Sequence, residues 1–185
     1  MVRDTILFGD CRETLKEFDG KARTCVTSPP YYGLRNYGNE EDQIGQEQTP
    51  EEYIQSLVEV FRSVRDVLTD DGTLWVNIGD SYYNYRPGKG QALPKQTVSK
   101  TKQDLPDKCA KRGNKLEGLK EKDLIGIPWM LAFALRADGW YLRQDIIWHK
   151  PNPMPESVRD RCTKSHEYLF LLSKNKKYYY DNEAC

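Results

Sequence analysis

The residues with the clearest chemical potential are Ser28-Pro29-Pro30-Tyr31, within the stretch TSPPYYGLRNYG at residues 27–38. Two consecutive prolines cannot donate to a strand ladder, so they leave a rigid turn whose carbonyl oxygens have no competing N–H group. The Ser28 hydroxyl adds a further acceptor, and Tyr31 and Tyr32 add aromatic faces. A flat substrate with an exocyclic amine fits this turn, because its ring stacks on a tyrosine while its NH2 group donates to the oxygens.

Such a turn would also activate the amine. When two oxygens accept hydrogen bonds from both N–H groups of the amine, the nitrogen lone pair is drawn out of conjugation with the ring and becomes nucleophilic. The alternative is a structural Pro-Pro turn with surface tyrosines. The place of Ser28 directly after a predicted strand favours the chemical interpretation, since ligands of α/β sheets gather at the carboxyl ends of strands.

Hydrophobic spacing and capping signals predict the elements that position this turn. Strands are expected at residues 5–8, 23–27, 73–78, 140–150 and 166–181, the last as a hairpin turning at residues 174–176. Helices are expected to begin after Asp10, at Pro50 and at Pro128. Strands and helices in alternation, closed by an antiparallel hairpin, predict an α/β open sheet. Asp10, Ser28 and Asp80 each follow a predicted strand.

Composition excludes several classes of protein. The chain has 185 residues, 38% hydrophobic and 30% charged, which fits one globular domain and excludes a fibrous or disordered chain. No apolar run approaches the ~20 residues of a membrane span. The five cysteines are odd in number, widely spaced and without a C-x-x-C pair, so we expect no disulfide framework, no metal site and a reducing cytoplasmic location.

Charge is unevenly distributed along the chain. The 28 basic and 28 acidic residues cancel, yet residues 86–122 carry eleven lysines and arginines against four acids. This segment has no apolar periodicity, so we expect a flexible insertion in a single domain over residues 1–185. Because neutralised phosphates release counterions, the insertion is a candidate contact for the phosphates of a polyanion, with a solvated linker as the alternative. The candidate contacts are Lys89, Lys95, Lys100, Lys102, Lys111, Arg112 and Lys115.

The chain resembles the DNA amino-methyltransferases, which transfer a methyl group from S-adenosylmethionine to an exocyclic base amine. Ser28-Pro29-Pro30-Tyr31 matches their catalytic motif, (Asp/Asn/Ser)-Pro-Pro-(Tyr/Phe), and its early position resembles the permuted beta arrangement. The further similar segments are GDCRETL, GTLWVNIGDSY, GIPWMLAFALRADGWYLRQDIIWHKPNPMPESV and RCTKSHEYLFLLSKNKKYYYD. The resemblance implies a Rossmann-like S-adenosylmethionine-dependent methyltransferase sheet with double-stranded DNA as its partner.

The same resemblance implies a role for each matching residue. The Ser28 hydroxyl and the Pro29 carbonyl would accept hydrogen bonds from the target amine, and Pro30 would keep the turn rigid. Tyr31 would stack on a base flipped out of the duplex.

Two further groups of residues carry implied roles. Asp10 and Asp80 would contribute to cofactor binding, although Asp10 also fits a plain helix cap. The edge of the base pocket would be formed by Tyr32, Trp148 and Lys150.

The target base is narrowed by two features. Methylation of cytosine at carbon 5 would need a Pro-Cys nucleophile, and the sequence contains no Pro-Cys dipeptide. In the family, serine at the first motif position is typical of N4-methylcytosine enzymes and aspartate of N6-methyladenine enzymes. Ser28 therefore favours cytosine N4, with adenine N6 as the alternative.

A glycine-rich cofactor loop is expected from the family downstream of the closing hairpin, yet the sequence contains no G-x-G-x-x-G motif. We therefore expect a methyltransferase domain that is incomplete at its C-terminus, either truncated or complemented by a further polypeptide segment that carries the loop. Two other interpretations stay open. One is a non-catalytic DNA-binding module, in which the aromatic turn only stacks bases, and the other is an inactive remnant.

The basic insertion leads to a testable prediction. Replacing its seven candidate contacts by alanine should weaken duplex binding and flatten the dependence of the binding constant on salt, because fewer counterions are released. Fluorescence anisotropy with labelled duplex at low and moderate salt measures both effects. A wild-type binding constant that does not change between the two salt concentrations would remove the insertion from the interface.

Overall fold

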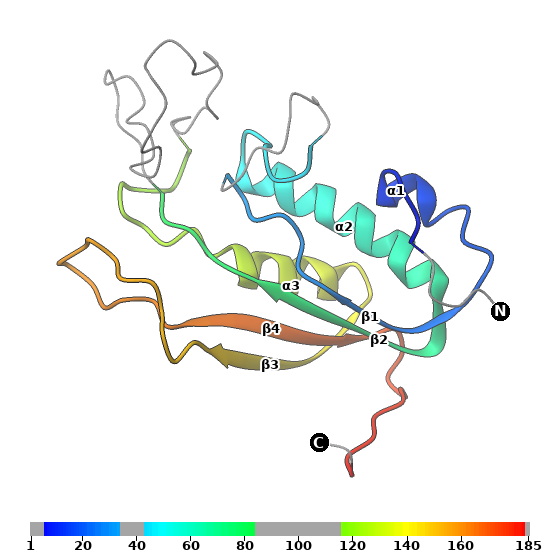
Figure 1. Cartoon of the computed structure of the whole chain (residues 1–185). Helices are drawn as coiled ribbons and strands as arrows, with labels where there is room; N and C mark the ends of the chain where they lie inside the picture. The colour runs from blue at the N-terminus through cyan, green and yellow to red at the C-terminus, as the bar shows by residue number, and fades with distance from the viewer. Residues whose placement is uncertain (1–5, 34–42, 84–115, 184–185) are drawn as a thin grey trace.

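The computed structural model describes residues 6–33, 43–83 and 116–183 (Figure 1). Its elements are α1 (Cys11–Thr14), β1 (Ala22–Thr27), α2 (Pro50–Val67), β2 (Leu68–Ile78), α3 (Ile127–Ala137), β3 (Tyr141–His149) and β4 (His166–Ser173). The four strands form one sheet in the order β1-β2-β4-β3. β1 lies parallel to β2, whereas β4 is antiparallel to both β2 and β3. The predicted α/β sheet is confirmed.

Helix α2 forms where the capping signals place it. The Thr49 hydroxyl accepts from the Glu52 N–H at 3.2 Å, and the Glu52 carboxylate accepts from the Thr49 N–H at 3.2 Å. This reciprocal capping box satisfies two backbone donors that the first turn leaves unpaired, and Pro50 starts the helix with a suitable φ. The helix connects the parallel strands β1 and β2, as a crossover must.

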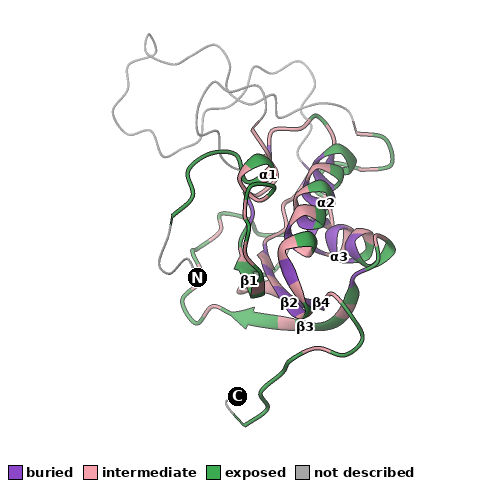
Figure 2. Cartoon of the chain, turned by 90° about the vertical axis from the view of Figure 1, so that its right-hand side faces the viewer, coloured by how far each residue is buried: buried purple, intermediate pink, exposed green. Residues whose placement is uncertain are grey.

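The core lies between the sheet and the two longer helices. α2 and α3 cover the same face of the sheet (Figures 1 and 2). Alternate residues of β2 point to this face, and they are paired with apolar residues of β4 in register. The largest side chains that are almost fully buried there include Tyr53, Leu57, Phe61, Leu74, Ile78, Leu131 and Phe170.

Two predicted strand segments are corrected by the structure. Residues 6–8 form no strand, and Ile6 and Phe8 are 75% and 88% exposed, although β1 has a free edge on the side away from β2 in the described sheet. The predicted hairpin within 166–181 is also wrong: β4 ends at Ser173, and residues 177–180 form no strand. β4 already has a partner on each side, so a returning strand could not pair with it. The antiparallel pair is instead β3 with β4.

The second strand is longer than its sequence signal. We expected it over residues 73–78, but β2 begins at Leu68. Leu68 pairs with Ala22, and the ladder then shifts register, because the next pair is Thr24 with Thr73. The strand β2 therefore includes the turn-forming residues at positions 70–72.

Three further expectations concern the DNA contacts, a membrane span and a metal site. All seven candidate DNA contacts fall within residues 84–115, outside the described residues; of the predicted insertion only residues 116–122 are described. No helix among the described residues combines the length and the apolar character that a membrane crossing needs. In those same residues, no group of three or more histidine, cysteine, aspartate or glutamate side chains could hold a metal ion.

Candidate functional site

The candidate site lies where β1 and β2 end and β4 begins. Ser28 follows the last residue of β1 and is exposed, whereas the Pro29 side chain behind it is buried. β2 ends at Ile78, which is paired with Tyr168 near the start of β4. This register brings Glu167 level with Gly79, so the turn after β1, the end of β2 and the start of β4 share one edge of the sheet.

Helix α2 braces the turn from the core side. The Tyr53 hydroxyl donates to the Pro30 carbonyl at 2.7 Å, and the Tyr53 side chain is fully buried. Burial raises the pKa of Tyr53 well above its usual value, so the phenol stays protonated and keeps donating. The Pro30 carbonyl is therefore committed to the fold, which agrees with the rigid role expected of this proline.

Tyr31 is tied to the neighbouring strands through its hydroxyl. The hydroxyl donates to Glu167 Oε2 at 3.0 Å, and it also lies 3.3 Å from Asn77 Oδ1. Burial is the main cause that raises the pKa of Tyr31, and the Glu167 carboxylate raises it further, while the polar groups of Ser28 and Gly79 oppose this shift. The ring also lies directly against Gly79, because a Cβ at Gly79 would be 2.6 Å from Tyr31 Cε2.

Two lysines complete the charged part of the site. Lys150 donates to Glu167 Oε1 in an ion pair. Burial lowers the pKa of Lys164, while the charges of Asp80, Glu167 and Glu156 oppose that shift. The turn therefore adjoins a compact group of opposite charges at the edge of the sheet.

The three expected base-pocket residues lie in different surroundings. Lys150 contacts Glu167 and so reaches the Tyr31 hydroxyl through one carboxylate. Trp148 lies on β3 opposite Glu167 and is 55% exposed, available to a ligand from outside. Tyr32 is directed to the start of α2: its hydroxyl donates to the Gln48 carbonyl at 3.2 Å, and its ring lies 5.4 Å from that of Tyr53. Burial raises the pKa of Tyr32 to about 12.

Asp80 is used by the fold. Its Oδ1 accepts from the backbone N–H groups of Ser81, Gly126 and Ile127 at 2.9, 3.0 and 3.1 Å, and its Oδ2 lies 3.1 Å from the Gly126 nitrogen. Gly126 is the N-cap of α3 and has no capping side chain of its own. Asp80 therefore supplies the missing cap and the negative charge that the N-terminus of α3 favours.

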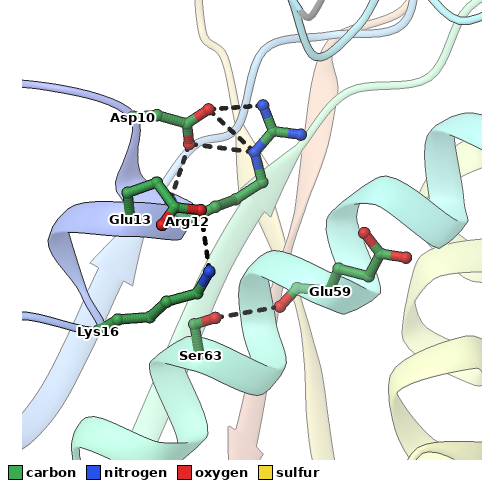
Figure 3. Close-up of polar contacts among 6 residues, drawn as sticks. All are labelled: Asp10, Arg12, Glu13, Lys16, Glu59 and Ser63. Carbon is green, nitrogen blue, oxygen red and sulfur yellow. Dashed lines mark hydrogen bonds and ion pairs between the residues drawn. The ribbon is translucent and has the colours of Figure 1, made fainter.

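Asp10 caps α1, which lies beside α2 (Figures 1 and 3). Its carboxylate accepts from the Arg12 backbone at 2.8 Å and from the Arg12 guanidinium at 2.5–3.1 Å. These hydrogen bonds to Arg12 lower the pKa of Asp10. Glu13 in the first turn of α1 pairs with Lys16 at 2.9 Å.

Sequence reasoning missed several residues of this site, among them Asn77, Glu167 and Lys164. Glu167 did carry a signal, since a charged residue that opens an otherwise apolar strand is unusual and marks a group with a specific partner. Tyr53 had no separate signal, because its helical spacing assigned it to the core. The structure shows that it belongs to both.

The sequence of this chain matches one known family over most of its length. The model of the N6/N4 DNA methylase family matches residues 22–185. This chain belongs to that family. Among relatives of this DNA methylase, the type II methyltransferase M.SmaI of Serratia marcescens is 55% identical over 185 residues, covering 97% of this chain and 59% of the relative. M.Cfr9I of Citrobacter freundii is 53% identical, covering 97% and 57%. The chain thus spans less than two thirds of the length of these relatives.

Solved structures share the fold of this DNA methylase. The PvuII DNA methyltransferase (cytosine-N4-specific) superposes with a TM-score of 0.58 at 16% identity, covering 92% of this chain and 49% of that one. A DNA modification methylase of Thermus thermophilus, in complex with S-adenosylmethionine, gives 0.57 at 20% identity, covering 95% and 55%. At these identities the likeness shows the Rossmann-like methyltransferase fold.

The close approach of Tyr31 to Gly79 gives a prediction. Gly79→Ala should displace the Tyr31 ring and break its bond to Glu167, lowering the free energy of unfolding by about 1–3 kcal/mol, the usual range for overpacking. In a Tyr31→Ala background the same substitution should cost little, because the added methyl group then meets open space. Urea unfolding of the four proteins measures both costs. Equal losses in the two backgrounds would contradict the contact.

Proposed function

We propose that this DNA methylase transfers a methyl group from S-adenosylmethionine to the exocyclic amine of a base in double-stranded DNA, with cytosine N4 as the favoured target. The supporting observation is the turn Ser28-Pro29-Pro30-Tyr31 at the carboxyl end of β1. Its serine is exposed, its backbone is braced by Tyr53, and its tyrosine is anchored by Glu167. Membership of the family supports an acceptor for a base amine over a plain turn.

The residues of the turn divide the work between holding and activating the amine. The Ser28 hydroxyl and the Pro29 carbonyl accept its two hydrogens, which leaves the nitrogen lone pair free to attack. The Tyr31 ring offers a face for the flipped base, and its anchored hydroxyl keeps that face in place. A rigid acceptor turn lowers the barrier because the amine is held ready without reorganisation.

Only some of the residues expected at an S-adenosylmethionine site are available to bind this cofactor. When bound, this cofactor supplies an electrophilic methyl group. The acceptor turn fits that chemistry, but the two carboxylates expected at the cofactor are already engaged: Asp80 caps α3, and both oxygens of Asp10 contact Arg12. Of the two, Asp10 is the more accessible, with a side chain 42% exposed, and it could exchange Arg12 for a cofactor hydroxyl.

A further polypeptide segment completing the cofactor site is therefore part of the proposal. β1 belongs to a parallel pair, and parallel strands ordinarily have both faces covered, but among the described residues one face of β1 is open. Val26 on that strand is 73% exposed, and Ile6 and Phe8, which precede β1 in the chain, are exposed as well. The relatives are long enough to supply such a segment, since this chain spans 59% of M.SmaI.

The turn itself provides the test of the proposed reaction. Ser28→Ala should reduce methyl transfer by roughly 100-fold or more, as loss of one well-placed catalytic hydrogen bond does, while duplex binding stays unchanged. Mass spectrometry of nucleosides from treated DNA measures the product. N4-methylcytosine supports the favoured target, and N6-methyladenine identifies the alternative.

The control for this substitution is Ser63→Ala. Ser63 lies on α2, away from the turn, and its hydroxyl donates to the Glu59 carbonyl one turn earlier in the helix (Figure 3). Its loss should leave transfer intact. Wild-type protein that binds duplex, with the completing segment present, and yet methylates neither base would contradict the enzymatic proposal and favour a DNA-binding module.

Cofactor binding tests the completing segment separately. Calorimetric titration of the 185-residue chain with S-adenosylmethionine should show no tight one-to-one complex, because the two carboxylates expected at the cofactor are engaged within the fold. Asp10→Asn should weaken whatever binding the longer assembly shows. A tight complex with the 185-residue chain by itself would contradict the need for a further segment.

A further inference from the structure

The loop between β3 and β4 extends beyond the end of the sheet at which the candidate site lies (Figure 1). The base of this loop is closed by a hydrogen bond from the Lys150 N–H to the Ser165 carbonyl at 2.7 Å. The Lys150 ammonium pairs with Glu167, whose other carboxylate oxygen accepts from the Tyr31 hydroxyl at 3.0 Å. The loop therefore starts beside the turn at residues 28–31, and a large ligand of the turn would lie against it.

The returning part of the loop is fixed to neighbouring segments of the chain. Asp160 pairs with Lys122 at 2.6 Å, and the Arg161 guanidinium lies over the Tyr82 ring, 3.9 Å from the ring centroid. Within the part of the chain that the structure describes, residues 151–155 make no side-chain hydrogen bond or ion pair. These five residues form the loop tip, which is held in place by the remainder of the loop and is itself available to a ligand.

The loop tip is stiff and largely apolar. Its sequence is Pro151-Asn152-Pro153-Met154-Pro155, and each proline fixes its own φ and disfavours helical geometry in the residue before it. The Met154 side chain is 75% exposed. Because the backbone is already restrained, the tip loses little conformational freedom when a ligand covers it. Met154 is thus an exposed apolar side chain on a rigid support, suited to insertion between apolar surfaces.

The charge around the tip favours a polyanion as the ligand. Residues 150–165 carry four basic side chains and two acidic ones, namely Lys150, Arg159, Arg161 and Lys164 against Glu156 and Asp160. Both acids are paired with cations of the protein, whereas Arg159 is exposed and has no ion-pair partner among the described residues. Duplex DNA combines phosphates on its outside with stacked apolar base faces inside, so it matches both the charge and the apolar tip.

We propose that Met154 enters the base stack of the duplex at the position that the target base leaves. This inference rests on the proposed function, because a base in a duplex reaches the turn only after it has left the stack. The gap is bounded by the apolar faces of the neighbouring bases, and a flexible thioether side chain fills it and opposes the return of the base. Met154 therefore acts on extrusion of the base and not on transfer of the methyl group.

Met154→Ala tests this role on two substrates. The first is a duplex that the wild-type assembly methylates, and the second has an abasic site opposite the target base, so that base pairing no longer holds the base. We expect the single-turnover rate of the variant to fall about 10-fold or more on the paired duplex and to stay within about twofold of wild type on the abasic duplex. Met154→Leu keeps an apolar side chain of similar size and should retain the wild-type rate on both.

The matched control is Tyr141→Ala. Tyr141 is also a large exposed side chain, but it begins β3, at the opposite end of that strand from the loop. Its loss should change neither rate. A second measurement follows extrusion directly, through the fluorescence of 2-aminopurine at the target position, which rises when this base leaves the stack. Wild-type protein should raise the signal, and Met154→Ala should give less than about half of that rise.

The outcomes for this inference and for the proposed function differ. Assays use wild-type and variant proteins in the same assembly, with the completing segment present. If Met154→Ala matches wild type on the paired duplex, the role of Met154 is overturned and the proposed function stands. An equal loss on both substrates also overturns it, and indicates that the tip contacts protein, such as the completing segment. Absence of transfer by the wild-type assembly on both substrates overturns both proposals.

Discussion

The turn after β1 is held from two sides, and the rest of the site depends on that double restraint. From α2, Tyr53 donates to the Pro30 carbonyl; from β4, Glu167 accepts from the Tyr31 hydroxyl. Two prolines make the turn stiff but cannot attach it to the sheet, because they have no N–H to donate. The attachments therefore come from side chains that belong to elements far away in the sequence.

These restraints require the surrounding elements to be positioned accurately. α2 carries Tyr53 on its buried face, and its start is defined by the Thr49–Glu52 capping box. The antiparallel register of β2 and β4 brings Glu167 level with Gly79, where the absence of a side chain leaves room for the Tyr31 ring. A shift of one residue in that register would turn Glu167 to the opposite face of the sheet.

Asp80 shows how one residue type can fit two roles until its surroundings are known. An aspartate after a strand in an α/β sheet is a reasonable cofactor ligand, and the family resemblance implied that role for Asp80. In the structure its carboxylate accepts from three backbone N–H groups at the start of α3, where Gly126 provides no side chain. The carboxylate thereby orients the helix that packs against α2 and closes the core.

Local signals in the sequence determined the elements and predicted the chemistry of the turn. Apolar spacing and caps placed α2, α3, β1 and β3, and the type and order of residues 28–31 predicted an amine acceptor, because each depends on neighbours within a few positions. The partners of the turn depend on contacts between distant segments: Tyr53 and Glu167 lie 23 and 136 positions from the residues they bind. The tertiary structure also decided that residues 166–181 form no hairpin, because β4 is paired on both sides, with β2 and with β3, and offers no free edge to a returning strand.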